Sequence, residues 1–167
     1  MKKKQPFSHI SESGSAKMVG VSGKKLTLRT ARAETFVLVG HDIADQLRDT
    51  GGISKGNVLE TAKLAGIMAA KGTSGLIPMC HPIPLDLVEI DAEIEDDRVR
   101  IESRVSCEWK TGVEMEAMTA ASVAALTVYD MVKSAGKGIR IGPLSLLEKT
   151  GGKSGEWKRG ENSDGKS

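Results

Sequence analysis

Residues 88–107 alternate between apolar and charged side chains on both sides of a short acidic turn, and this pattern constrains the fold more than any other. The apolar positions are Val88, Ile90, Ala92 and Ile94 before the turn and Val99, Ile101, Val105 and Cys107 after it. A period of two on both sides of a turn is typical of a β-hairpin with one face in the core and one in solvent. The charged face is acidic on the first strand and mostly basic on the second. We therefore expect cross-strand ion pairs, worth roughly a few tenths of a kcal/mol each.

The rest of the chain supplies the other elements of one α+β domain. We expect strands over 24–39 and 138–149 and helices over 58–71 and 113–135. The first strand is expected to bend near Arg32, and Asn57 with Glu60 resembles a capping box that opens the first helix. The order strand, helix, strand, strand, helix, strand predicts a ferredoxin-like β-α-β-β-α-β fold, an antiparallel sheet with two helices on one face.

Composition divides the chain into three parts and narrows the classes of function. We expect an N-terminal arm over 1–24, a single ferredoxin-like catalytic domain over 25–150 and a flexible C-terminal tail over 151–167. The 24 basic and 22 acidic residues argue against a nucleic-acid binder. No run approaches the ~18 apolar residues of a membrane span. A cytoplasmic protein is the default expectation.

The cysteines and histidines show no metal-binding pattern. Cys80 and Cys107 form no CxxC pair, which argues against a zinc ribbon and a disulfide framework. The three histidines are dispersed, so we expect neither a metal nor another cofactor.

The segment LIPMCHPIPL, residues 76–85, places Cys80 and His81 among three prolines. Prolines remove backbone donors and fix φ, so the segment is stiff and not helical. It is either a rigid structural turn or a holder that fixes the imidazole for a ligand, and both readings remain open on the residues alone.

The second predicted helix carries two groups of charged residues. Asp130 and Lys133 are three apart and share a helical face, which fits a surface ion pair or an acid–base pair. Glu114 and Glu116 flank Met115 in the first turn, where acidic residues favour the helix dipole. The same two carboxylates would also suit a heterocycle that bears an amino group.

The segment EKTGGKSG does not form a Walker A loop, because Leu147 stands where that motif needs glycine. Lys55, Lys149 and Lys153 nevertheless all lie beside glycines. Such loops let backbone amides approach anionic oxygens and suit a phosphorylated ligand, although an ordinary basic surface has the same composition.

Four segments together resemble the C protein family of molybdenum cofactor biosynthesis, the cyclic pyranopterin monophosphate synthases. They are KGNVLETAKLAGIMAAK, LIPMCHPIPL, TGVEMEAMTAASVAALTVYDMVK and LLEKTGGKSG, and the likeness runs from about His9 to Gly155. The resemblance implies a ferredoxin-like fold and a homohexamer built as a trimer of dimers. It also implies a lyase reaction without redox change. The substrate, (8S)-3′,8-cyclo-7,8-dihydroguanosine 5′-triphosphate from an upstream radical enzyme, becomes cyclic pyranopterin monophosphate and pyrophosphate.

The resemblance also implies roles for particular residues. The catalytic aspartate and its lysine partner fall on Asp130 and Lys133. The matching substrate-binding positions are Met79, Cys80, His81, Met115, Glu116, the nearby Glu114, Lys55, Lys149 and Arg29. Gly20 stands where the family usually has an aspartate, which puts the packing of the N-terminal arm in doubt.

Two further expectations concern assembly and rival functions. Fourteen residues separate Glu116 from Asp130, about 21 Å along one helix, so we expect two antiparallel subunits to share each active site. The alanines expected to permit that approach are Ala117, Ala120, Ala121 and Ala124. The alternative function is a non-catalytic sensor of a phosphorylated metabolite. An RNA-binding sheet is disfavoured because Trp109 is the one aromatic residue on the hairpin.

Overall fold

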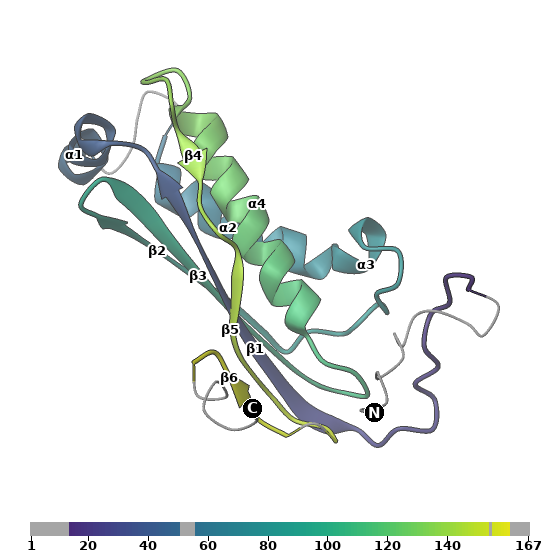
Figure 1. Cartoon of the computed structure of the whole chain (residues 1–167). Helices are drawn as coiled ribbons and strands as arrows, with labels where there is room; N and C mark the ends of the chain where they lie inside the picture. The colour runs from purple at the N-terminus through teal and green to yellow at the C-terminus, as the bar shows by residue number, and fades with distance from the viewer. Residues whose placement is uncertain (1–13, 51–55, 154, 161–167) are drawn as a thin grey trace, which may run out of the picture.

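The computed structural model describes residues 14–50, 56–153 and 155–160, which form one antiparallel sheet with helices packed against it (Figure 1). The strands are β1 (Thr27–Leu38), β2 (Leu87–Glu95), β3 (Arg98–Trp109), β4 (Arg140–Ile141), β5 (Ser145–Thr150) and β6 (Trp157–Lys158). The helices are α1 (His41–Thr50), α2 (Val58–Lys71), α3 (Thr73–Leu76) and α4 (Glu114–Val132). The sheet order is β2-β3-β1-β5-β6, and the short β4 also pairs with β1. This arrangement confirms the predicted α+β class and is consistent with a ferredoxin-like fold.

The hairpin and the first predicted helix form as the sequence indicated. β2 and β3 form the expected antiparallel hairpin, and ion pairs join Glu89 to Arg104 at 3.2 Å and Glu95 to Arg98 at 2.8 Å. The Asn57 side chain accepts a hydrogen bond from the Glu60 backbone N–H at 3.0 Å and caps α2. The pairing of β1 with β5 shifts register just after Arg32, at the position where a bend was expected.

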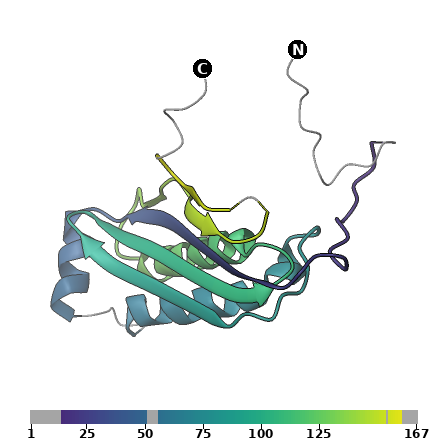
Figure 2. The same ribbon diagram turned by 90° about the horizontal axis from the view of Figure 1, so that it is seen from below.

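One face of the sheet is covered by α4 and α2, and the core lies between these layers (Figure 2). Small side chains let the layers approach closely. A Cβ at Gly66 of α2 would lie 3.0 Å from the Ala120 carbonyl oxygen of α4. The Ser103 hydroxyl of β3 donates to the Ala117 carbonyl oxygen at 2.7 Å, which ties the sheet to α4.

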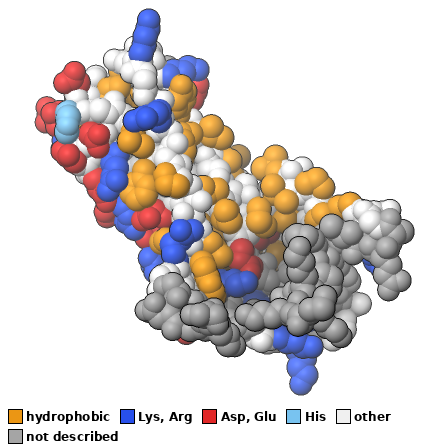
Figure 3. All heavy atoms as spheres, viewed as in Figure 1, with side chains coloured by type: hydrophobic (Ala, Val, Ile, Leu, Met, Phe, Trp, Pro, Cys, Tyr) orange, Lys and Arg blue, Asp and Glu red, His pale blue; other side chains and the backbone are white. Residues whose placement is uncertain are grey.

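The expected contact role of the α4 alanines was wrong. Ala117, Ala120, Ala121 and Ala124 are fully buried in the core of their own chain, because this face of α4 packs on the sheet and on α2. The exposed apolar side chains of α4 lie elsewhere and include Leu126, which is 56% exposed, and Tyr129. Figure 3 shows hydrophobic side chains gathered along the band that α4 follows in Figure 1.

Three short elements were not predicted from the sequence: α1, α3 and β6. The strand predicted over 138–149 is divided into β4 and β5. α1 buries Ile43, Ala44 and Leu47 at helical spacing, a signal that was present but confined to ten residues. β6 belongs to the segment predicted as a flexible tail, and it pairs with β5 through Lys158 opposite Glu148. A two-residue strand has no periodicity to detect, so only its partner strand reveals it.

Candidate functional site

Two adjoining hollows lie near the start of α4. The first, which we call the histidine hollow, has a volume of about 420 Å³. It is lined by Met79, Cys80, His81, Glu114, Met115 and Glu116, together with side chains of the N-terminal arm and of the segment before α4. The second, the basic hollow, measures about 680 Å³. Lys24 and Glu114 line both hollows, so the two hollows adjoin.

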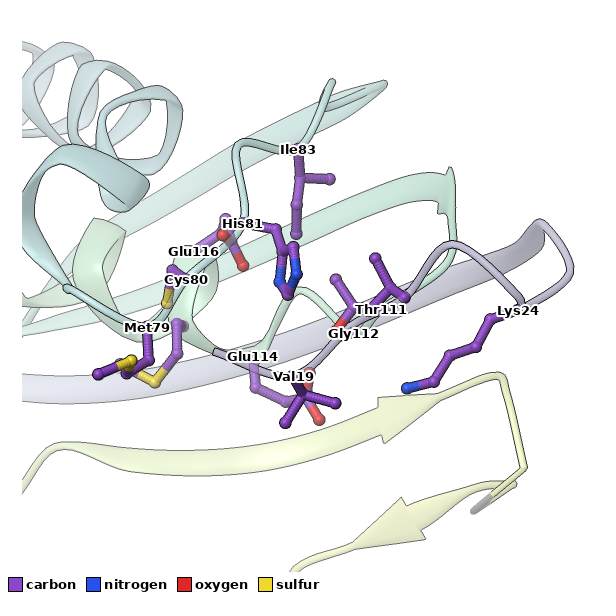
Figure 4. A pocket seen from close by; sticks show the side chains of 12 residues that line it. Val19, Lys24, Met79, Cys80, His81, Ile83, Thr111, Gly112, Glu114 and Glu116 are labelled. Atoms are coloured by element: carbon purple, nitrogen blue, oxygen red, sulfur yellow. The ribbon is translucent and has the colours of Figure 1, made fainter. Parts of the chain in front are cut away.

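The proline-containing segment holds one side of the histidine hollow. The Cys80 backbone N–H donates to the Ile77 carbonyl oxygen at 3.0 Å, and the Asp86 carboxylate accepts from the Glu108 backbone N–H at 2.8 Å. Ile83 packs against the core. These contacts anchor the segment at both ends, and Figure 4 shows Cys80 and His81 beside Glu116 of α4.

Glu116 is the chemically unusual group of the histidine hollow. Its side chain lies in the first turn of α4 and the residue is only 3% exposed. Burial raises the pKa of the Glu116 carboxyl above its usual range, and the negative charge of Glu114 raises it further. Burial and the Glu116 charge likewise raise the pKa of the Cys80 thiol. Within the described residues no cation forms an ion pair with Glu116.

The basic hollow gathers cations from distant parts of the chain. Its basic residues are Lys24, Lys25, Arg29, Lys110, Lys149 and Lys153. Lys149 on β5 donates to Glu114 at 2.8 Å, and Arg29 Nε on β1 donates to the Trp109 carbonyl oxygen at 3.3 Å. One carboxylate among these cations leaves an excess of positive charge, which suits a polyphosphate.

Sequence reasoning missed three of these cations, Lys24, Lys25 and Lys110. Lys24 directly follows Gly23, and Lys110 precedes Gly112 by two residues, so the glycine-flanked pattern used for other lysines was present here too. The pattern alone did not show that β1, β3 and β5 bring these segments to one end of the sheet.

The predicted pair Asp130 and Lys133 lies at the other end of α4 and lines neither hollow. Lys133 Nζ donates to Asp130 Oδ1 at 2.6 Å, and both side chains are more than half exposed. The hydrogen bond and charge of Asp130 raise the pKa of Lys133. A single chain therefore does not bring this pair to Glu116.

Two other expectations have simple outcomes. Lys55 lies outside the described residues. Among the described residues, no atom lies within 4 Å of the place where a Cβ at Gly20 would be.

No group of three or more His, Cys, Asp or Glu side chains in the described ranges is arranged to hold a metal ion. No helix in this part of the chain has the length and apolarity needed to cross a membrane.

The fold and the site together define an α+β protein with a hollow lined by basic residues at one end of its sheet. The MoaC family model matches residues 18–152, and the chain belongs to the MoaC family. Curated relatives carry the name cyclic pyranopterin monophosphate synthase. The protein from Streptomyces avermitilis is 53% identical over 153 residues, which cover 92% of this chain and 89% of the relative. The protein from Staphylococcus carnosus is 53% identical, with 92% and 96% covered, and that from Bacillus licheniformis is 50% identical, with 92% and 93% covered.

Proposed function

We propose that this chain is a cyclic pyranopterin monophosphate synthase, a lyase of molybdenum cofactor biosynthesis. It converts (8S)-3′,8-cyclo-7,8-dihydroguanosine 5′-triphosphate to cyclic pyranopterin monophosphate and pyrophosphate. The observation that carries this conclusion is about 50% identity to synthases of that name over 92% of the chain. No relative favours the alternative of a non-catalytic sensor.

The different linings of the two hollows support one orientation of the bound substrate. We propose that the triphosphate lies in the basic hollow against Arg29 and Lys149, and that Lys55 joins these groups. The cyclised purine then lies in the histidine hollow, where a carboxyl, a thiol and an imidazole offer hydrogen-bond partners. The proposed contacts of the purine are Met79, Cys80, His81, Glu114, Met115 and Glu116.

The rearrangement needs proton transfers and the departure of pyrophosphate. We propose that Asp130 and Lys133 exchange protons with the substrate, and general acid–base catalysis of this kind contributes typically about 10²–10⁴-fold. Closure of the cyclic phosphate expels pyrophosphate, whose growing negative charge is stabilised by the cations of the basic hollow.

The proposal requires two subunits for each active site. Asp130 stands about 21 Å along α4 from Glu116, so one chain cannot present both to one reacting centre. A second copy lying antiparallel brings its Asp130 to this chain's Glu116, and two-fold symmetry then gives two equivalent sites. The exposed Leu126 and Tyr129 of α4 supply apolar surface for that contact. We propose that such dimers assemble into a homohexamer in the cytoplasm.

Mixing two inactive variants tests the shared site. Glu116→Ala and Asp130→Ala proteins are unfolded and refolded together, and turnover is compared with that of each variant alone. Random assembly of shared sites leaves roughly one site in four with both residues intact, so about a quarter of the activity returns. Mixed oligomers that form and stay inactive would place both contributions in one chain.

The activity itself is tested by incubation with the cyclised guanosine triphosphate and mass analysis of the products. We expect a cyclic phosphate and one equivalent of pyrophosphate. Tight binding without either product would favour the sensor instead.

A further inference from the structure

The turn that follows β5 lies directly against the start of β1. Gly151 and Gly152 form this turn with φ angles of +96° and +71°, a region that L side chains rarely adopt. A Cβ at Gly151 would lie 2.2 Å from the backbone carbonyl oxygen of Leu28. A Cβ at Gly152 would lie 1.8 Å from Nη1 of Arg29 and 2.6 Å from its Cζ. The first glycine therefore makes room for backbone, and the second makes room for a guanidinium.

The Arg29 guanidinium is held from two sides in the basic hollow. Its Nε donates to the Trp109 carbonyl oxygen at 3.3 Å on one side, and the backbone of Gly152 lies against its terminal nitrogens on the other. Arg29 and Gly152 both line the basic hollow, beside Lys149 and Lys153. Because a guanidinium binds phosphate through a planar fork, its orientation decides how many of its N–H groups reach the ligand.

We propose that Gly152 is a positioning residue, which seats the Arg29 guanidinium in the orientation that binds the phosphate groups of the ligand. This inference rests on the proposed function for the identity of the ligand, and on the close approach of Gly152 for the mechanism. A methyl group at position 152 occupies the space of the guanidinium. Since that group ends a flexible side chain, it swings away while the fold persists.

Gly155 provides a matched control in the same turn. Its φ angle is +65°, close to that of Gly152, but no atom of the described residues lies within 4 Å of the place where its Cβ would be. Alanine at either position therefore introduces similar backbone strain, and only alanine at position 152 meets Arg29.

The experiment measures binding of inorganic tripolyphosphate by calorimetry to wild type, Gly152→Ala, Gly155→Ala, Arg29→Ala and the double variant Arg29→Ala/Gly152→Ala. We expect Gly152→Ala and Arg29→Ala each to weaken binding by about tenfold, as the loss of a hydrogen bond to a charged group does. Gly155→Ala binds like wild type. The double variant binds like Arg29→Ala alone, because the residue that Gly152 positions is already gone.

Several outcomes would overturn the inference. They are equal binding by Gly152→Ala and Gly155→Ala, additive losses in the double variant, or no binding of tripolyphosphate to wild type. Where Arg29→Ala does not fold, Arg29→Lys replaces it, and Gly152→Ala must then cost less in that background than in wild type. Tripolyphosphate binding is independent of turnover. A wild type that binds it but forms no cyclic phosphate therefore refutes the proposed function and leaves the role of Gly152 intact.

Discussion

Two buried glutamates, Glu102 and Glu116, occupy opposite chemical situations in this protein. Glu102 lies on the sheet face away from the helices and is 7% exposed. Arg32 Nε and Arg100 Nη2 donate to its two carboxylate oxygens, each at 2.6 Å. Burial alone would raise the pKa of Glu102, but the hydrogen bonds and charges of Arg32 and Arg100 outweigh it and hold that pKa below its usual range. Glu116 is buried as deeply, and its pKa is raised.

The difference shows that burial does not determine what a carboxyl does in this fold. Glu102 is supplied with cations by β1 and by its own strand, so its charge stabilises the sheet. Glu116 lines the histidine hollow, whereas most of the nearby cations line the basic hollow. There Lys149 forms an ion pair with Glu114 and not with Glu116. A buried carboxyl with a raised pKa that lines a hollow is a candidate for contact with a ligand.

The largest effect on turnover is expected from Asp130 and Lys133, which contact neither Glu102 nor Glu116 within one chain. Asp130→Ala or Lys133→Ala should lower turnover by about 10²–10⁴-fold, since each removes a proposed proton-transfer group. Both side chains are more than half exposed, so thermal unfolding should change little. Lys63→Ala is the matched control, because Lys63 forms the same spacing of ion pair with Glu60 on α2. Equal turnover in the Lys133 and Lys63 variants would contradict the proposed catalytic pair.

Exchanging each buried glutamate for glutamine separates the two situations. Glu102→Gln should lower the free energy of unfolding by about 1–3 kcal/mol, because it leaves two charged hydrogen bonds poorly matched. Glu116→Gln should leave stability within about 1 kcal/mol and lower turnover at least about tenfold. Denaturant unfolding and product formation are measured on both proteins. Two results would contradict this comparison. One is a Glu102→Gln protein that loses activity but keeps its stability, and the other is a Glu116→Gln protein that loses stability but keeps its activity.

The pH dependence of stability should have opposite signs at the two sites. The lowered pKa of Glu102 means that its stabilisation is present above the unfolded pKa and is lost as pH falls through the folded pKa. The raised pKa of Glu116 means that ionisation opposes folding, so its contribution becomes unfavourable as pH rises through the folded value. As pH rises, wild type should gain stability relative to Glu102→Gln at and below the ordinary glutamate pKa of about 4.3, and should lose stability relative to Glu116→Gln above that value. If the stability differences of both variants from wild type changed with pH in the same direction, the proposed contrast between Glu102 and Glu116 would be wrong.

The smallest effect is expected at the edge of the charged sheet face. Arg104 contacts Glu89 at 3.2 Å and reaches Glu102 only at 4.0 Å, and its side chain is about half exposed. Arg104→Ala should therefore cost about 0–1 kcal/mol of unfolding free energy. Arg32→Ala, which removes the 2.6 Å contact to Glu102, should cost more. Denaturant unfolding of both variants sharpens the comparison, and equal losses would show that Glu102 draws no particular stability from Arg32.

Local pattern in the sequence determined the elements that are long and periodic. The hairpin of β2 and β3, the Asn57 cap of α2 and the body of α4 all follow from residues that lie within a few positions of one another. The resemblance to the MoaC family likewise grouped residues from 79–81 and 114–116 that line one hollow. The short strand β6 was not predicted, because two residues carry no period.

Tertiary structure alone decided which charged groups are paired and which are free to act. Arg100 lies only two positions from Glu102, but Arg32 reaches Glu102 across seventy positions of sequence, which no local pattern predicts. The sequence likewise did not show that Gly152 lies against the Arg29 guanidinium. It also did not show that the sheet and α2 bury the α4 alanines completely. Side-chain periodicity reports only a residue's own helix or strand. The partners that set burial, charge and pKa come from strands that the fold brings together, so the chemistry of this site emerges only when β1, β3 and β5 meet α4.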